Sequence, residues 1–381
     1  MKMWKKLVSL GLAVAMIAAL AACGGGSAAP AESEPAATEA QQGGEQAPAP
    51  AEGALKVGYN IFGYGSVALS TLAGNQNYVI STVGDEAVEI SDDFQVDKMI
   101  SDIENLCAQG CNGVLPWLVA DNMYTAVIEI CDGYGVPYAF PDKVPQALKD
   151  QCLADPLFAG AVGPNNALYG ELAANYALGK GAKTAIIASG QAGDPTDTPR
   201  IEKFKEVFEA GGGTVVVTVN TSSNDQIYSD IENTVIGNPD VDVIYGTGSD
   251  YGIQAAKVLA NKGNDKTLVV TSGFDTSALD EFKNGGIDYL SGDYWISGTM
   301  AAVALENYIH GNQLKDAEGK APWLDAVPPF ELTQDNPGDY DLLIANFIDK
   351  APYSEDEIKA MIGISYDDFV KIITNYSLQD R

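Results

Sequence analysis

The amino-acid sequence predicts an α/β protein of two similar Rossmann-like lobes, each built on a parallel sheet. Three observations predict this fold class. Short apolar segments without polar alternation recur along the chain, as expected of strands buried on both faces. Amphipathic segments of helical period lie between them, and the order of these units is repeated in two halves. Repeated β-α units require parallel sheets that are covered by helices.

The individual elements follow from the apolar pattern and from the residues that interrupt it. Strands are predicted at 55–61, 87–90, 113–117, 136–140, 158–162, 183–188, 214–219, 241–245, 267–271 and 288–292. Helices are predicted, among others, at 97–109, 126–134, 166–178, 201–210, 226–236 and 251–261. Several of these helices are followed by glycine, as is common after a last helical turn.

The two halves match in detail at the ends of their strands. The segment 136–140 runs into Asp142, and the segment 268–274 runs into Asp275. In open α/β sheets, ligands bind at the carboxyl ends of the strands. Two such edges facing each other predict an interdomain ligand cleft, and the family resemblance given below implies a three-strand hinge between the lobes.

The predicted domain organisation has four parts. These are a signal peptide at 1–22, a flexible linker at 23–53, a first lobe at 54–162 plus 294–326, and a second lobe at 163–293 plus 327–381. The second lobe is expected to carry a C-terminal helical extension. It contains two capping-box patterns, which begin at Ser354 and Ser365.

The first residues have the layout of a secretory signal. Lysines precede an apolar run at 7–22, which ends in Leu-Ala-Ala before Cys23. This pattern is similar to a bacterial lipobox and predicts lipidation of Cys23. A membrane-spanning helix is the weaker alternative, because the run is shorter than the ~20 residues that a bilayer core requires. Residues 24–53 lack aromatic and large aliphatic side chains and predict a flexible tether.

The composition restricts the partners. The formal net charge of −30 excludes nucleic acid and anionic lipid surfaces as expected partners, so the lipid anchor is the only predicted membrane contact. No cofactor and no metal site are expected. Cys107, Cys111, Cys131 and Cys152 are interpreted as buried free thiols, although the sequence leaves pairing open. His310, the only histidine, is expected at the surface near a helix end.

One motif supports a different function. Gly63-Tyr-Gly65-Ser-Val-Ala68 follows the first strand and matches a dinucleotide-binding fingerprint, with Glu89 near the position of a ribose-binding acid. The motif is short and weakly specific. Because an extracytoplasmic protein would meet little NAD, an NAD-dependent oxidoreductase is only a remote alternative. The preferred interpretation is that these glycines ease a strand-to-helix turn beside a ligand cleft.

From about residue 55 to residue 330, the chain resembles the type I periplasmic binding proteins, the ribose- and galactose-binding group. The segments that carry the resemblance are Lys56-Val-Gly-Tyr-Asn60, Gln109-Gly110-Cys-Asn-Gly-Val-Leu115, Gly135-Val-Pro-Tyr-Ala-Phe-Pro-Asp142-Lys143, Gly163-Pro-Asn165-Asn166, Arg200-Ile-Glu-Lys-Phe204 and Gly273-Phe274-Asp275. No single segment is specific, whereas their order and spacing together are.

The resemblance implies a substrate-binding lipoprotein of a sugar ABC transporter, and not an enzyme. It implies that charged side chains bind sugar hydroxyls and that aromatic rings cover the sugar face. The ligand-binding residues carried over by position or proximity are Asp142, Lys143, Arg200, Asp275, Asp293, Trp117, Tyr64, Phe62, Ser249 and Asp250. Asp275 is expected to be among the strongest contacts.

The sequence also departs from the family pattern. Lys143 stands where sugar binders usually have arginine, which removes a bidentate donor, and Gly248-Ser249-Asp250 replaces an Asn-Asp pair. The expected function is capture of a small carbohydrate by hinge closure, with a monosaccharide as the expected ligand. The expected partners are ABC permease subunits, and the expected state is an extracytoplasmic, lipid-anchored monomer. A nucleoside, an autoinducer, another polar ligand or a sensory role remain alternatives.

Overall fold

The computed structural model describes residues 53–64, 67–221, 223–293, 295–345 and 351–377. The predicted signal peptide, the lipidation site Cys23 and almost all of the predicted linker lie outside the described residues. Within the described residues, no helix is both long enough and apolar enough to span a membrane.

The first lobe is built on a six-stranded sheet with the strand order β11-β5-β4-β3-β1-β2. Its strands are β1 (Lys56–Ile61), β2 (Glu86–Ser91), β3 (Gly113–Leu115), β4 (Tyr138–Phe140), β5 (Phe158–Pro164) and β11 (Trp323–Val327). All described pairings in this sheet are parallel. The accompanying helices are α1 (Val67–Val83), α2 (Val96–Ala108), α3 (Asp121–Tyr134), η1 (Gln146–Leu148), α4 (Lys149–Ala154) and α10 (Ile296–Ile309).

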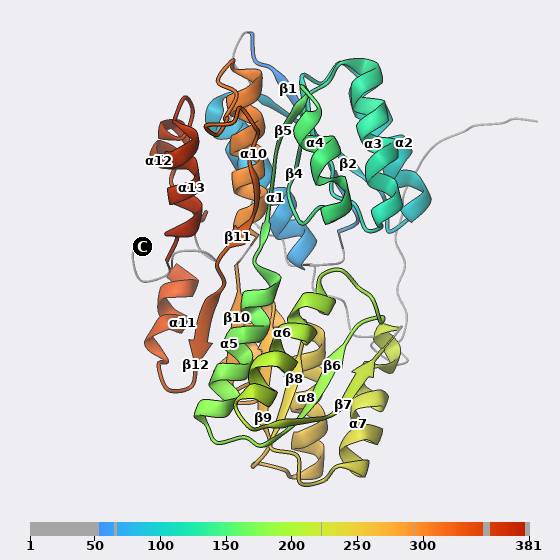
Figure 1. Ribbon diagram of the computed structural model, residues 1–381, viewed down its shortest axis with the longest axis vertical. Coiled ribbons are helices and arrows are strands. Elements are labelled where there is room, and N and C mark those ends of the chain that lie inside the picture. Colours follow the sequence, from blue (N-terminus) through green and yellow to red (C-terminus); the bar gives the residue numbers. More distant parts are fainter. Residues whose placement is uncertain (1–52, 65–66, 222, 294, 346–350, 378–381) are drawn as a thin grey trace, which may run out of the picture. The chain divides into compact units, whose positions relative to one another are not determined.

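The second lobe repeats this design with the order β12-β10-β9-β8-β6-β7 (Figure 1). Its strands are β6 (Thr184–Ser189), β7 (Thr214–Asn220), β8 (Val243–Gly246), β9 (Leu268–Ser272), β10 (Tyr289–Gly292) and β12 (Phe330–Thr333). Only β12 is antiparallel among the described strands. The helices are α5 (Asn166–Gly179), α6 (Asp197–Ala210), η2 (Asn224–Gln226), α7 (Ile227–Gly237), α8 (Ser249–Lys262), α9 (Thr276–Lys283) and α11 (Gly338–Leu343).

The predicted fold class is confirmed, and every predicted strand and helix overlaps an observed one. Within the described residues, the chain passes between the two sheets three times, at 164–166, 292–296 and 327–330, as expected of a three-strand hinge. The sequence analysis missed β11, because this edge strand pairs only with β5 and carries Asp325 inside a short apolar run.

The C-terminal helices α12 (Glu355–Ala360) and α13 (Tyr366–Thr374) contact first-lobe elements, namely α1 and β11. This differs from the expected assignment of 327–381 to the second lobe. The buried amide of Asn307 on α10 explains the placement in part, because it donates to the carbonyl of Met361 and accepts from the N–H of Gly363. Figure 1 shows both helices beside α10. The predicted capping box at Ser354 is present.

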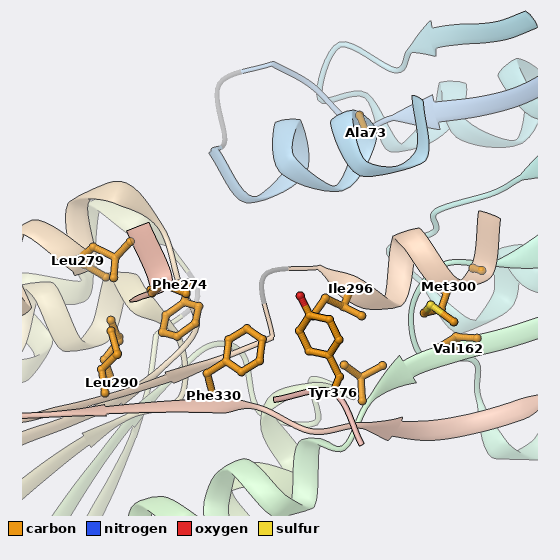
Figure 2. Close-up of a cluster of buried hydrophobic side chains, with 14 of the residues drawn as sticks. Ala73, Val162, Phe274, Leu279, Leu290, Ile296, Met300, Phe330 and Tyr376 are labelled. Atoms are coloured by element: carbon orange, nitrogen blue, oxygen red, sulfur yellow. The ribbon is translucent and has the colours of Figure 1, made fainter. Parts of the chain in front are cut away.

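A hydrophobic cluster contains buried side chains of both lobes, from Val57 on β1 to Ile186 on β6. Near the hinge, Phe330 stacks on Phe274 with a centroid distance of 6.3 Å and meets Tyr376 at 5.5 Å (Figure 2). Aromatic contacts at these separations add to the stability gained from buried area. The segment after β12 therefore helps to build the core beside the chain crossings.

The described cysteines Cys107, Cys111, Cys131 and Cys152 are free and buried, which confirms their interpretation as buried free thiols. Burial raises the pKa of Cys111 to about 11 and that of Cys152 to about 12. Thiols held in this protonated form are weak nucleophiles and weak metal ligands. These two residues are therefore core side chains.

Candidate functional site

A cavity of about 330 Å³ lies between the carboxyl ends of strands from both sheets. This is the edge at which α/β sheets bind ligands. The lining residues are Trp117, Leu118, Val119, Asp142, Lys143, Pro164, Tyr169, Asp194, Pro195, Thr196, Arg200, Gly248, Ser249, Gly273, Phe274, Gly292, Asp293 and Trp295. The volume and the mixture of aromatic and charged side chains suit a small polar ligand.

Trp117 forms an aromatic wall of the cavity, and hydrogen bonds to its backbone hold it in place. The side-chain amide of Asn60, at the end of β1, accepts from Trp117 N at 2.8 Å and donates to Trp117 O at 3.0 Å. Asn60 is itself fixed by Asp92, whose Oδ2 accepts from Asn60 Nδ2 at 2.7 Å. Burial raises the pKa of Asp92 to about 7. The ring of Phe62 packs against Trp117 with centroids 6.1 Å apart.

Asp142 and Lys143 follow β4 and contribute charges from the first lobe. Asp142 Oδ1 accepts from the N–H of Lys143 at 2.7 Å, which orients the carboxylate towards the cavity. The indole N–H of Trp117 lies 3.4 Å from Asp142 Oδ2. Lys143 Nζ donates to Thr196 Oγ1, which belongs to the second lobe. The two walls of the cavity are therefore joined by a direct polar contact.

Arg200, on α6, is the main cation of the second lobe and is only 8% exposed. Its Nε donates to Asn166 Oδ1 at 2.9 Å, and its Nη1 donates to the carbonyl of Thr247 at 2.6 Å. The guanidinium also lies 4.3 Å from the ring centroid of Tyr169, a separation at which cation and ring attract. Arg200 is thus held rigidly before any ligand arrives.

Asp293 lines the cavity directly after β10, and one of its carboxylate oxygens is buried. Its Oδ1 accepts from Trp295 N at 3.2 Å, whereas its Oδ2 is buried without a hydrogen-bond partner. Burial, with a smaller contribution from the nearby charge of Asp142, raises the pKa of Asp293 to about 6. A buried acceptor without a partner is costly in free energy unless something else satisfies it. A ligand hydroxyl in the cavity is such a partner.

The lining has more acidic than basic side chains. Asp142, Asp194 and Asp293 face the cavity with Lys143 and Arg200. An anionic ligand would be repelled by the carboxylates, so the electrostatics favour a neutral or weakly cationic ligand that offers hydroxyl or amine donors. The half-buried rings of Trp117 and Trp295 provide flat apolar surfaces beside these charges.

Six of the predicted site residues line this cavity, namely Asp142, Lys143, Arg200, Asp293, Trp117 and Ser249, and four do not. Phe62 packs behind Trp117, and Tyr64 is 60% exposed. Asp250 lies in the first turn of α8. Asp275 Oδ1 accepts from Ala278 N at 2.7 Å and caps α9. A ligand contact by Asp275 stays a prediction, and its carboxylate already has a structural partner.

The sequence analysis missed several lining residues, including Asp194, Thr196, Trp295, Phe274 and Tyr169. Most of them follow a strand, so the rule that polar and aromatic side chains gather at strand carboxyl ends could have found them. Tyr169 lies inside α5 and gave no such signal. Asn60, which fixes Trp117, lies inside the predicted first strand and gave no separate signal.

Gly63, the first glycine of the dinucleotide-like motif, has a packing role. A Cβ atom at this position would lie 2.5 Å from the ring of Phe94, which is far closer than atoms can approach. Phe94 in turn packs edge-on against Phe62, with centroids 5.5 Å apart. The missing side chain of Gly63 thus makes room for an aromatic ring, and this explains the glycine without a bound pyrophosphate.

With this geometry in view, comparison with known proteins identifies the family. The model of the periplasmic binding protein domain matches residues 76–313. The chain therefore belongs to this family, whose members are binding proteins and not enzymes. This confirms the expected relationship and the expected fold class.

Individual relatives agree with this assignment. The chain is 25% identical over 226 residues to the ribose import binding protein RbsB of Bacillus subtilis, which covers 57% of this chain and 70% of the relative. The crystal structure of a periplasmic ribose ABC transporter protein from Conexibacter woesei matches with a TM-score of 0.66 and 19% identity, over 79% of this chain and 97% of that one. GanP, a glucose-galactose binding protein from Geobacillus stearothermophilus, matches with a TM-score of 0.62 and 17% identity, over 74% and 98%. These structural likenesses concern the fold.

Proposed function

We propose that this protein captures a small carbohydrate in the cavity between its lobes and delivers it to an ABC importer. The proposal rests on two charged side chains that line the cavity, Asp293 and Arg200. Asp293 offers a buried acceptor oxygen without a partner, and Arg200 is a buried donor fixed by Asn166 and Thr247. A sugar hydroxyl both accepts and donates, so it can satisfy the two groups together.

The likeness to the ribose import binding protein of Bacillus subtilis supports a monosaccharide as ligand. The excess of carboxylates in the lining supports a neutral polyol over a phosphorylated sugar. Trp117 and Trp295 would cover the apolar faces of the ring. The replacement of the usual arginine by Lys143 favours a hydroxyl pattern other than that of ribose, because lysine cannot form the bidentate contact.

Binding by both lobes would couple ligand capture to hinge closure. A ligand stabilises the closed state only through contacts that it makes better there. Lys143 and Thr196 already connect the lobes, so a ligand that adds Asp142 on one side and Arg200 on the other would strengthen the same closure. The closed form would then dock on the permease as a monomer, tethered to the extracytoplasmic side of the membrane through a lipidated Cys23.

A nucleoside is the second candidate ligand, because the rings of Trp117, Tyr169, Phe274 and Trp295 all line the cavity. Flat aromatic walls stack on a planar base as well as on a sugar face. The ribose part of a nucleoside could occupy the polar groups that a monosaccharide would use.

A thermal-shift screen followed by calorimetry tests the proposal. The panel consists of aldopentoses, aldohexoses, inositols, nucleosides and NAD, because a ligand specific for the folded state raises the melting temperature. We expect a neutral sugar to give the largest shift and to bind one molecule per chain. The matched variants are Asp293→Asn, within the cavity, and Glu318→Gln, at an exposed position. Loss of the shift only in Asp293→Asn supports the site, whereas a shift with nucleosides or NAD alone refutes the carbohydrate assignment.

A further inference from the structure

A second group of ligating side chains lies away from the ligand cavity. Glu306 lies in the last turn of α10, His310 directly follows this helix four positions later, and Asp85 lies between α1 and β2. One ligand atom of each residue lies within 4.8 Å of the others. His310 Nε2 is 2.7 Å from Asp85 Oδ2 and 3.5 Å from Glu306 Oε2. Asp85 precedes its strand, so the group lies at the amino-end edge of the first sheet, opposite to the cavity edge.

The carboxylate of Glu306 is the unusual member of this group. It is completely buried, and neither of its oxygens has a hydrogen-bond partner. In the part of the chain that the structure describes, no lysine or arginine pairs with Glu306 or Asp85. Burial, followed by the neighbouring carboxylate of Asp85, raises the pKa of Glu306 to about 9. Among the described residues, His310 is the group that can supply a positive charge here, and its Nε2 lies closer to Asp85 than to Glu306. The buried carboxyl group of Glu306 therefore still needs a proton or a metal ion.

We propose that Asp85, Glu306 and His310 form a binding site for a divalent transition-metal ion, with Zn²⁺ as the reference ion and water completing the coordination. One imidazole nitrogen and two carboxylate oxygens are ligands that zinc accepts. The nitrogen ligand disfavours Ca²⁺ and Mg²⁺, which prefer oxygen.

The spacing of the ligand atoms fits this ion. Around a tetrahedral zinc ion with bonds of ~2.0–2.1 Å, neighbouring ligand atoms stand about 3.3 Å apart. The separation of 3.5 Å between His310 and Glu306 already matches, and the 2.7 Å between His310 and Asp85 would widen slightly as the ion replaces their hydrogen bond. The side chain of His310 is 35% exposed, which leaves a route for the ion from solvent.

The surrounding structure holds one ligand in place. Asp85 Oδ1 accepts from the N–H of Leu55 at 2.8 Å, so the other oxygen is directed at His310. Such contacts behind a ligand fix its orientation at a metal. Because Leu55 directly precedes β1, an ion here would tie the beginning of the described sheet to the C-terminal end of α10, on the side where a tether at 23–53 would join.

Titration of the purified, metal-stripped full chain with Zn²⁺ and with Co²⁺ tests the site. We expect one equivalent to bind, a visible Co²⁺ absorption band, and a rise in melting temperature with Zn²⁺. His310→Ala and Glu306→Gln should each weaken this binding at least ~10-fold, because loss of even a contact behind a ligand weakens metal binding by about 10- to 100-fold. Glu318→Gln, which removes an exposed carboxylate, should leave it unchanged.

The outcomes are distinct. If the wild type and His310→Ala bind Zn²⁺ equally, the ions are held by the acidic surface or by thiols, and the proposal is wrong. It is also wrong if the stripped wild type binds no ion, because a proton shared by Glu306 and Asp85 then accounts for the cluster. Circular dichroism checks that the variants fold. If Glu306→Gln fails to fold, the test rests on His310→Ala, because the His310 side chain is partly exposed. Sugar affinity is measured separately and tests the proposed function independently.

Discussion

Helix α10 has a buried carboxyl group near each of its ends, and the two are in different surroundings. Asp293 lies just before the helix, beside the cavity of about 330 Å³ and within the influence of Arg200. Glu306 lies in the last turn, some 15 Å further along the helix at 1.5 Å per residue. It faces Asp85 and His310.

The difference shows that a buried carboxyl oxygen without a hydrogen-bond partner can indicate two different kinds of binding site. Both carboxyl groups have a buried oxygen without a hydrogen-bond partner and a pKa raised by burial. Beside an open cavity with fixed donors, such a group fits an organic ligand. Beside a second carboxylate and an imidazole at ligand spacing, it fits a metal ion. The neighbours of the group, and not its burial alone, decide which binding site it indicates.

The largest effect is expected from Asp293→Asn. It removes the charged acceptor of the cavity while keeping a side-chain oxygen for the N–H of Trp295. Because hydrogen bonds to charged groups contribute about 1.5–3 kcal/mol, we expect sugar affinity to fall roughly 10- to 100-fold. Calorimetry measures this fall, and metal affinity at the other end of α10 should not change. Unaltered sugar affinity would remove Asp293 from the ligand site.

The next effect is a pH dependence of sugar affinity. The pKa of Asp293 is raised from 3.8 to about 6. Ligand binding to the ionised form should therefore weaken about tenfold between pH 7 and pH 5. The stability of the ligand-free protein should change in the opposite direction. Below pH 4 Asp293 is protonated in both the folded and the unfolded state, and the stability that comes from its raised pKa is fully present. This stability is lost as pH rises towards 6, because in that range the folded state holds a proton that the unfolded state has released.

Both pH trends are measured on the same preparation, by calorimetry for affinity and by denaturant unfolding for stability. Asp293→Asn should flatten both curves. If the affinity is constant from pH 7 to pH 5 in the wild type, the ligand does not depend on the ionised form of Asp293.

A smaller effect is expected from Asp275→Ala. This carboxylate caps α9 by accepting from Ala278 N, and loss of such a cap costs about 1 kcal/mol of stability. We expect a lower denaturant midpoint and sugar affinity within about threefold of the wild type. A loss of affinity as large as that of Asp293→Asn would instead restore Asp275 to the ligand site, as the family resemblance implies.

The smallest effect concerns coupling between the two ends of α10. Saturating Zn²⁺ should change the sugar dissociation constant by less than about twofold. In the part of the chain that the structure describes, the polar side-chain contact of Glu306 is with His310, which does not line the cavity. Calorimetric titration of sugar with and without Zn²⁺ measures the coupling. A larger change would mean that the two ends are linked and that α10 transmits the effect.

Much of the fold could be predicted from the sequence, because buried parallel strands are continuous apolar runs that end in polar residues. The strand ends at Asp142 and Trp117 were found in this way, whereas Asp293 was carried over from the family resemblance, and all three line the cavity. Edge strand β11 and the packing of α13 on the first lobe were not found. A short strand with a polar interruption has no clear apolar pattern. The apolar face of a helix can fit either lobe, so the sequence does not predict which lobe the helix packs against.

The sequence by itself determined the α/β class, the twofold repetition and the acidic character of the chain, since periodicity and composition are local properties. Only the tertiary structure decided which carboxyl groups are left without partners. It gave Asp275 to a helix cap, left Asp293 facing the cavity, and placed Glu306 beside Asp85 and a histidine that the sequence treated as a surface residue. Hydrogen-bond satisfaction depends on contacts between segments more than two hundred positions apart, such as Asp85 and His310, which are separated by 225 positions, and no local pattern records such contacts.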